Sequence, residues 1–283
     1  MDTKYVRKTY SNPTPILNVE TPMQKLSSFL SSHKCITDSC LCSNIFQYYH
    51  LCYSESEQNH VEFVTRGQSQ NNNWFNMRKG LITASNFKKV CSSTDLTKTG
   101  EHLLRDPFDN DCLPSPIQFG RRFEDKARDM YLKSHRFKHR QCQVSVPGLV
   151  LFNDEQCPFL GCSPDGVVNC KICGSFLIEV KCSYKFRSFH PKSALKMSSI
   201  CQEDETGSLY LKQSHPYYYQ IQGQMAVTGI TKCVLVCYTH KGIHCVEVGF
   251  DVEFWELCKE KLLSFYTGIF FSQLKEVATV ANN

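Results

Sequence analysis

The order of apolar and polar positions along the chain predicts helices arranged around a β-sheet. Apolar residues that recur at three- and four-residue spacing indicate helices, whereas alternating residues or short apolar runs between turn residues indicate strands. The expected helices are 23–31, 42–51, 85–91, 116–135, 215–228 and 251–271. The expected strands are 142–152, with a Pro-Gly interruption, 164–169, 175–182, 232–241 and 243–250. We therefore expect an α/β fold with a central mixed β-sheet flanked by helices.

Two segments depart from this pattern. Residues 1–70 carry scattered Pro, Ser and Cys and end in the polar run RGQSQNNN, which is typical of a linker or an exposed loop. We expect 1–70 to be an N-terminal Cys- and His-containing appendage of unknown role, and 71–283 to be the main domain. Residues 191–214 are polar and irregular, so we expect a mobile loop that contacts substrate there.

The hairpin predicted between Gly161 and Cys182 carries the most informative polar residues. Its sequence contains GCSPDG, a short gap and then LIEVKC, which places Asp165, Glu179 and Lys181 on two neighbouring strands. Carboxylate oxygens are the ligands that hard cations such as Mg²⁺ prefer. A lysine beside such a cation can steady the water or hydroxide that attacks phosphorus. This combination indicates a hydrolytic nuclease.

Strand geometry accounts for the Glu-Val-Lys spacing. Successive side chains on a strand point to opposite faces, so Glu179 and Lys181 share one face while Val180 points into the core. Asp165 and Glu179 can supply two oxygen ligands, and the backbone carbonyl of Val180 offers a third. The protonation state of Lys181 stays open, because a cation and neighbouring carboxylates act on it in opposite directions. An ordinary hairpin with a solvated acid and a Glu–Lys pair is the alternative.

In its wider context, this pattern resembles the PD-(D/E)xK nuclease superfamily. Within that superfamily it is similar to the lambda exonuclease and YqaJ-type viral recombinase family. The likeness covers roughly Asn71 to Phe271, and its five sequence elements occur in the family's order. The resemblance implies a restriction-endonuclease-like core and makes 71–283 a nuclease domain.

The resemblance also implies roles for residues on two helices. Within FGRRFEDKARDMYLKSH, Glu124 matches a carboxylate that reaches the metal site, and within HPYYYQIQGQMAVTG, Tyr217 and Gln220 match a helix that faces the active site. The implied catalytic residues are Glu124, Asp165, Glu179 and Lys181. The implied metal ligands are Glu124, Asp165, Glu179 and Val180. The alternatives are a salt-bridged surface helix for Glu124, beside a buried stripe that contains Ala127, and a core position for the tyrosines.

Four further residues match phosphate contacts of the family. Within WFNMRKGLITASNF, Arg78 and Ser85 match the residues that hold the terminal phosphate of the DNA substrate. Ser163 and Arg187 match additional phosphate contacts. In the alternative interpretation, Arg78 is a surface arginine and Ser85 is only the N-cap of a helix that starts at Asn86. The two functions of Ser85 are compatible, because a helix N-terminus favours anions.

Composition narrows the class of protein without deciding it. A net charge of +5, from 32 basic and 27 acidic residues, is compatible with a DNA partner. No apolar run is long enough to span a bilayer, and the first residues contain no apolar segment typical of a secretory signal. We expect an intracellular protein with no membrane partner. Nuclear and cytoplasmic locations are not distinguished.

The 17 cysteines favour a reducing compartment, because their number is odd and no secretory signal accompanies them. Zinc prefers four nitrogen or sulfur ligands, often in pairs separated by two to four residues. Two groups leave a structural zinc ion open, although neither contains two well-spaced pairs. The first group is His33, Cys35, Cys40, Cys42, His50 and Cys52. The second group is Cys157, Cys162, Cys170 and Cys173.

From these residues and the family resemblance we expect a Mg²⁺-dependent nuclease, with Mn²⁺ as an alternative metal. The resemblance implies a 5′-to-3′ exonuclease that acts on linear duplex DNA in recombination, repair, or mobile-element or viral DNA processing. It also implies a homo-oligomer in the form of a ring-shaped trimer. The alternatives are an endonuclease of the same fold, a DNA- or protein-binding module without catalysis, and a purely structural zinc protein.

Overall fold

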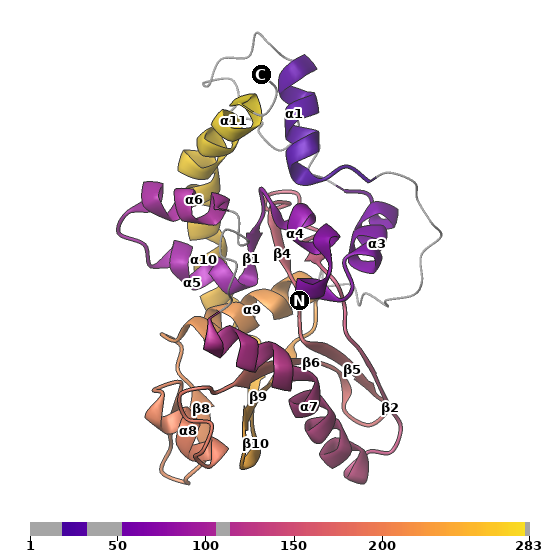
Figure 1. Ribbon diagram of the computed structural model, residues 1–283, viewed down its shortest axis with the longest axis vertical. Helices are drawn as coiled ribbons and strands as arrows, with labels where there is room; N and C mark the ends of the chain where they lie inside the picture. Colours follow the sequence, from indigo (N-terminus) through magenta and orange to yellow (C-terminus); the bar gives the residue numbers. More distant parts are fainter. Residues whose placement is uncertain (1–18, 33–52, 106–113, 281–283) are drawn as a thin grey trace. The chain divides into compact units, whose positions relative to one another are not determined.

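The computed structural model describes residues 19–32, 53–105 and 114–280 (Figure 1). The chain forms two compact units, and each is described separately. The first unit contains 114–146 and 164–250, and the second contains 19–32, 53–105, 147–163 and 251–280.

The first unit is built on a five-stranded mixed sheet. Its strand order is β10-β9-β6-β5-β2. The central strands β6 and β9 are parallel, and all other neighbouring pairs are antiparallel. The strands of this sheet are β2 Cys142–Ser145, β5 Gly166–Cys170, β6 Gly174–Cys182, β9 Lys232–Thr239 and β10 Gly242–Gly249. The unit also contains α7 Ser115–Lys138, α8 Pro191–Met197, α9 Pro216–Thr228 and a β7 Cys201–Glu203 and β8 Leu209–Leu211 hairpin.

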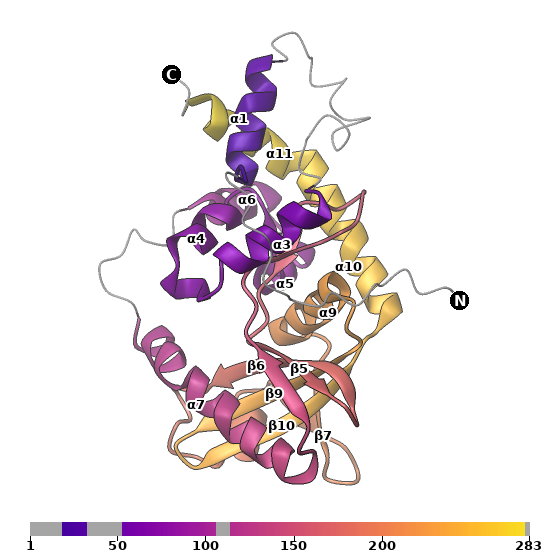
Figure 2. The same ribbon diagram turned by 90° about the vertical axis from the view of Figure 1, so that its right-hand side faces the viewer.

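The two faces of this sheet are covered by different helices. Helix α7 packs across β6 and β9 in both ribbon views (Figures 1 and 2). Its buried Ala127 lies in one apolar cluster with Ile178 and Val180. Because strand side chains alternate between faces, Glu179 points away from this cluster, toward α9. The predicted separation of Val180 from Glu179 and Lys181 is therefore confirmed.

The second unit is mainly helical and contains a small three-stranded sheet in the order β1-β4-β3. Its strands are β1 Ile82–Thr83, β3 Val150–Leu151 and β4 Leu160–Cys162. Its helices are α1 Pro22–Ser32, α3 Glu55–Val64, α4 Asn72–Arg78, α5 Phe87–Cys91, α6 Leu96–Leu104, α10 Val252–Phe265 and α11 Phe271–Val280. Short 3₁₀ turns cover Gln68–Gln70 and Ala84–Asn86, and a π-helical turn, Tyr266–Phe270, joins α10 to α11.

A close contact between α3 and the chain before β3 explains the Pro-Gly interruption in the predicted strand 142–152. A Cβ atom on Gly148 would lie 2.2 Å from the carbonyl oxygen of Glu62, so only glycine fits there. The backbone N–H of Gly148 donates to Glu62 Oε1 at 3.0 Å, and that of Leu149 donates to Thr65 Oγ1 at 2.7 Å. These bonds satisfy buried backbone donors that a continuous strand would have used in its ladder.

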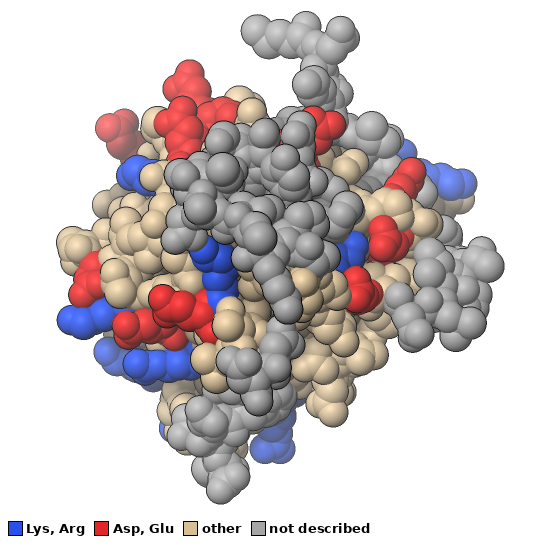
Figure 3. Space-filling view, turned by 90° about the horizontal axis from the view of Figure 1, so that it is seen from above, with Lys and Arg blue, Asp and Glu red and all other residues tan. Residues whose placement is uncertain are grey.

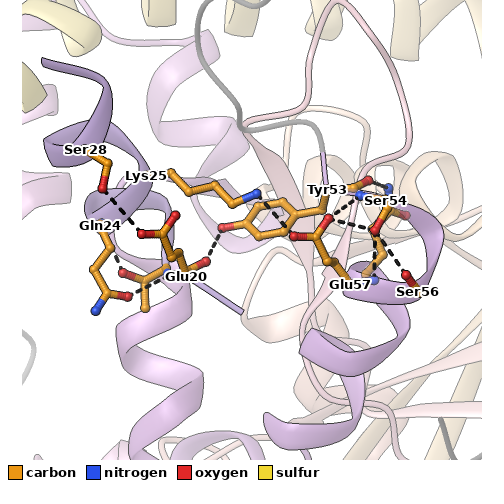
Figure 4. Close-up of polar contacts among 10 residues, drawn as sticks. Glu20, Gln24, Lys25, Ser28, Tyr53, Ser54, Ser56 and Glu57 are labelled. Carbon is orange, nitrogen blue, oxygen red and sulfur yellow. Dashed lines mark hydrogen bonds and ion pairs between the residues drawn. The ribbon is translucent and has the colours of Figure 1, made fainter. Parts of the chain in front are cut away.

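The N-terminal helix α1 is fixed to the same unit by polar contacts (Figure 4). Lys25 Nζ lies 3.5 Å from Glu57 Oε1 and 4.0 Å from the ring centre of Tyr53, whose hydroxyl donates to the carbonyl of Glu20 at 2.9 Å. Ser54 caps α3 through a reciprocal pair of bonds with Glu57. Helix α1 also packs against α11.

The sequence placed most long elements correctly and several short ones wrongly. The predicted irregular loop 191–214 is wrong, because α8 and the β7–β8 hairpin form there. The polar run before Trp74 is not only a linker, since α4 begins within it, and α3 and α6 were not predicted. The expected helix 42–51 lies outside the described residues. The contacts within the chain place residue 70 inside the second unit rather than at a domain boundary. That residues 1–70 form an appendage with a separate role stays a prediction.

Candidate active site

Glu179 is the most buried charged side chain of the candidate site, with 1% of its surface exposed. It lies on β6 and is held by two glutamines of α9. Gln220 Nε2 donates to Oε1 at 2.6 Å, and Gln224 Nε2 donates to Oε2 at 2.8 Å. A buried carboxylate needs such donors to offset the loss of water. Its orientation is therefore fixed before any ligand arrives.

Lys181 follows on the same face of β6. Its Nζ lies 2.6 Å from Glu179 Oε1, donates to Gln220 Oε1 at 3.3 Å and lies 4.6 Å from the ring centre of Tyr217. Burial acts to lower the pKa of Lys181, but the carboxylates of Glu179 and Asp165 outweigh burial and raise the pKa above its usual value. Lys181 is therefore a protonated ammonium group at neutral pH.

Asp165 lies immediately before β5 and is tied to β6 by its side chain. Its Oδ2 accepts a hydrogen bond from the backbone N–H of Val180 at 2.7 Å. Burial raises the pKa of Asp165 well above its usual value, and the nearby carboxylates of Glu179 and Glu124 add to the increase. Without a metal, the protein therefore disfavours the ionised form of Asp165, which is the form that can bind a cation.

Glu124 enters the same electrostatic environment from α7. Burial raises its pKa, with further contributions from Glu179 and Asp125, while Arg128 opposes the increase. Arg128 Nη1 lies 3.6 Å from Glu124 Oε1 and also donates to the backbone carbonyl of Asp165 at 2.8 Å. One arginine therefore joins α7 to the start of β5.

The donor set in this unit fits a hard divalent cation. Burial raises the pKa values of Asp165 and Glu124, and repulsion from the neighbouring carboxylates adds to the increase. A cation that binds oxygen ligands, such as Mg²⁺, would relieve this repulsion. Raised pKa values together with a specific charged partner are typical of functional sites.

A second polar cluster lies in the other unit, around Arg78. The guanidinium of Arg78 stacks 3.8 Å from the ring centre of Trp74, and its Nη2 donates to Thr83 Oγ1 at 3.0 Å. Trp74 Nε1 in turn donates to Ser163 Oγ at 2.8 Å, and Ser85 Oγ lies 3.4 Å from Thr83 Oγ1. The predicted set Arg78, Ser85 and Ser163 is therefore brought together.

The charge of this cluster suits an anion. Burial lowers the pKa of Arg78 to about 10, so the guanidinium stays protonated at neutral pH. Ser85 is exposed within a 3₁₀ turn rather than at a helix N-cap, since Asn86 is the cap residue of α5. The interpretation of Ser85 as a helix cap is therefore wrong. Along the chain, Ser163 is separated from Asp165 only by Pro164.

The remaining predicted residues, Arg187, Tyr217 and Val180, have mainly local contacts. Arg187 follows β6, donates from Nη1 to the carbonyl of Tyr184 at 2.8 Å and lies 4.5 Å from the centre of that ring. Tyr217 lies in the first turn of α9, beside Lys181. Val180 has its side chain in the core and its N–H bound to Asp165.

Sequence reasoning missed three residues that complete these clusters. Gln224 lies one helical turn after Gln220, and Arg128 one turn after Glu124, so the spacing of four residues could have indicated both. Thr83 precedes Ser85 by two residues. Each of these residues contacts a predicted site residue directly.

The distribution of charge on the face shown in Figure 3 adds little to the functional evidence from the candidate site. Basic and acidic side chains lie intermixed on the face shown in Figure 3, in keeping with a net charge of +5. Among the residues that the structure describes, no helix is both long and apolar enough to cross a bilayer.

The fold is that of alkaline exonucleases. The chain is similar to the alkaline exonuclease LHK-Exo from Laribacter hongkongensis, with a TM-score of 0.53 and 20% identity, covering 74% of this chain and 97% of LHK-Exo. The complex of LHK-Exo with dAMP gives a TM-score of 0.55 at the same identity and coverage. A SOX–DNA complex gives 0.51 at 12% identity, covering 87% of this chain and 83% of SOX. The predicted fold class is confirmed.

The family assignment follows from the sequence itself. The model of the YqaJ-like viral recombinase domain matches residues 73–231, which is more than half of the chain. The chain therefore belongs to the YqaJ-like viral recombinase family, and the predicted resemblance is confirmed. A search of curated proteins finds no significant match.

Proposed function

We propose that this protein is a Mg²⁺-dependent deoxyribonuclease that degrades linear duplex DNA from its 5′ ends. The observation that carries the proposal is the buried Glu179–Lys181 pair beside Asp165 and Glu124. This arrangement combines oxygen ligands for a metal ion with a cationic side chain that can stabilise developing negative charge. Membership in a recombinase family and a fold shared with alkaline exonucleases support it.

In the proposed site, Glu124, Asp165, Glu179 and the Val180 carbonyl would hold the cation. When bound, Mg²⁺ would act as a Lewis acid that polarises the phosphate, and it would lower the pKa of a water molecule so that this water can lose a proton and supply hydroxide. Gln220 and Gln224 keep Glu179 oriented, which preorganises the ligand. Lys181 directs its ammonium protons toward the attacking water and the phosphate oxygens, where negative charge develops.

The proposed 5′ polarity comes from the family resemblance, and the Arg78 cluster offers a site that can hold the terminal phosphate. A charged guanidinium held against an indole ring can bind a phosphate with two parallel hydrogen bonds. Thr83, Ser85 and Ser163 add hydroxyl groups around it. A terminal 5′-phosphate carries more negative charge than an internal diester, so such a cluster favours DNA ends. Arg187 would contact a further phosphate.

The overall proposal is tested with purified protein, Mg²⁺ and two DNA substrates, a linear duplex and a closed circle. We expect loss of the linear DNA alone, and no loss when a chelator removes the metal. Cutting of the closed circle would instead assign an endonuclease of the same fold. A lack of digestion with either Mg²⁺ or Mn²⁺ would leave a DNA-binding module without catalysis.

The phosphate cluster makes a separate prediction. Replacement of Arg78 by alanine should lower cleavage of 5′-phosphorylated ends by about 10- to 100-fold, the value of a lost charge-assisted contact. Cleavage of 5′-hydroxyl ends should change little. Rates on the two substrates measure the effect, and Lys79→Ala, which removes the adjacent exposed charge, is the control. An unchanged preference for phosphate in Arg78→Ala would exclude this cluster as the 5′-phosphate site.

We also propose the ring-shaped trimer that the family resemblance implies. Light scattering, which measures molecular mass, tests it. A trimer would explain processive digestion, because a ring that encircles duplex DNA stays attached to it. If the active protein has the mass of a monomer, the proposed trimer is wrong, whereas the proposed chemistry is unaffected.

A further inference from the structure

Four potential metal ligands meet at the end of the first unit where α7 terminates. They are His135, His139, Cys170 and Cys173, and their ligand atoms all lie within 4.8 Å of one another. The histidines come from the last turn of α7 and the residue that follows it, and the cysteines flank the β5–β6 turn. Cys157 and Cys162, which the sequence grouped with Cys170 and Cys173, are not members of this group.

The spacing within each pair is that of a zinc site. His135 and His139 are four residues apart, so their rings lie on the same face of the helix. Cys170 and Cys173 are separated by two residues. Zinc sites of the Cys₂His₂ type combine a C-x₂₋₄-C pair with an H-x₃₋₅-H pair, and this chain supplies both in reverse order along the sequence.

Two of the ligand-atom distances are close to those of tetrahedral zinc, within a group that spans up to 4.8 Å. His139 Nδ1 lies 3.2 Å from Cys173 Sγ and 3.8 Å from Cys170 Sγ. For bond lengths typical of zinc, the ligand atoms of a tetrahedral site lie about 3.3–3.8 Å apart. The backbone N–H of Cys173 points at Cys170 Sγ at 3.4 Å, which is the kind of contact that stabilises a metal-bound thiolate.

The imidazole of His135 gives an independent indication. Its Nε2 is buried and has no hydrogen-bond partner in the part of the chain that the structure describes. Its ring stacks on that of His139, with centroids 4.7 Å apart and planes at 15°. A buried ring nitrogen without a partner is costly, and a metal bond would satisfy it.

We propose that His135, His139, Cys170 and Cys173 bind one structural Zn²⁺ ion. On binding, the two thiols lose their protons to solvent and coordinate as thiolates, while the imidazoles coordinate as neutral ligands. Two sulfur and two nitrogen ligands select zinc over Mg²⁺, which prefers oxygen.

This site is distinct from the carboxylate site. Glu124 and His135 are eleven residues apart on α7, which corresponds to about 16 Å along a helix. Zinc at this end would clamp α7 to the β5–β6 turn. Helix α7 carries Glu124, and the strand β6 that follows the turn carries Glu179 and Lys181, so the clamp would stabilise the framework without entering the chemistry. All four ligand positions are filled by protein, as in structural zinc sites.

The proposal is tested by zinc content, measured by mass spectrometry on the full chain expressed with zinc. Replacement of the exposed Cys173 by serine, or of His135 by glutamine, should lower the content by one equivalent per chain. Cys245→Ser, which removes a half-buried thiol on β10, should leave it unchanged. The test compares the zinc content of the variants with that of the wild type, because the N-terminal Cys and His group, which lies outside the described residues, can bind zinc as well.

Two further measurements keep the test independent of folding defects. Circular dichroism should show intact secondary structure in Cys173→Ser, and Co²⁺ loaded into the wild-type protein should give the visible bands of tetrahedral thiolate coordination. These bands should be absent in the variant. Equal zinc content in wild type and Cys173→Ser would overturn the proposal. A Cys170–Cys173 disulfide in protein purified without metal chelators would also overturn it.

Discussion

Replacement of Asp165 by asparagine is expected to lower DNA hydrolysis by about a thousand-fold or more, because the variant would lose one of the proposed charged ligands of the cation. The same change should make the metal-free protein more stable. Folding raises the pKa of Asp165, so its ionised form is disfavoured in the folded state. Stability from this group is therefore present at low pH and is lost as pH rises through the raised pKa. Asparagine removes this loss and can still accept the Val180 hydrogen bond.

The two effects are measured in parallel. DNA hydrolysis is followed with saturating Mg²⁺, and the Tm is measured without metal at neutral pH. We expect an increase of about 2–4 °C, the shift that about 1 kcal/mol produces in a protein of this size. Asp129→Asn, at an exposed position of the same helix as Glu124, is the control and should change neither quantity. A variant that is inactive and also less stable would argue for a structural role of Asp165.

Replacement of Lys181 by alanine is expected to lower the rate of hydrolysis by about a thousand-fold, the cost of losing a charged donor at the transition state. Metal affinity should be preserved or increased, because the ammonium group lies 2.6 Å from Glu179 and repels a cation. The remaining carboxylate keeps its two glutamine donors, so the fold should survive.

Single-turnover rates and calorimetric titration with Mg²⁺ separate these two effects. Lys232→Ala, on the neighbouring strand β9, removes a lysine that pairs with Glu247 and is the matched control. Wild-type rates in Lys181→Ala would show that the lysine has no part in the chemistry. Loss of Mg²⁺ binding together with activity would instead indicate that Lys181 maintains the site.

The central hairpin could be predicted because the residues that determine its structure lie close together in the sequence. Strand periodicity determines which of Glu179, Val180 and Lys181 share a face, and the structure has them as predicted. The two glutamines that fix Glu179 are more than 40 residues further along the chain. Gln220 was predicted from the family motif, and Gln224, one helical turn later on the same face of α9, could have been predicted from it.

The histidine and cysteine cluster could not be predicted from patterns of neighbouring residues, because its two pairs are far apart in the sequence. The sequence grouped Cys170 and Cys173 with nearby cysteines, although their neighbours in space are histidines 31 to 38 positions earlier. His135 lies on a helix whose other polar residues give an ordinary amphipathic pattern. Only the packing of α7 on β6 brings the two pairs together. The N-terminal Cys and His group lies outside the described residues.

The segment 191–214 was misjudged for a different reason. Its polar composition indicated a loop, but Pro191 begins α8, and buried Ala194 and Leu195 supply an apolar face too short to detect by periodicity. Lys192 and Lys196 then form ion pairs with Glu203 of β7. Contacts between elements, rather than the propensity of single residues, determine this part of the fold.

The hairpin of β5 and β6 constrains how this family can vary in length. Cys173 lies in its turn, and Glu179 lies six residues later on the strand. Insertion or deletion of one residue between them would exchange the two faces of β6, placing Glu179 in the apolar cluster and Val180 at the active site. A two-residue change would preserve the faces but displace the carboxylate by about 7 Å. Evolution can therefore lengthen the loops around this hairpin far more readily than the strand itself.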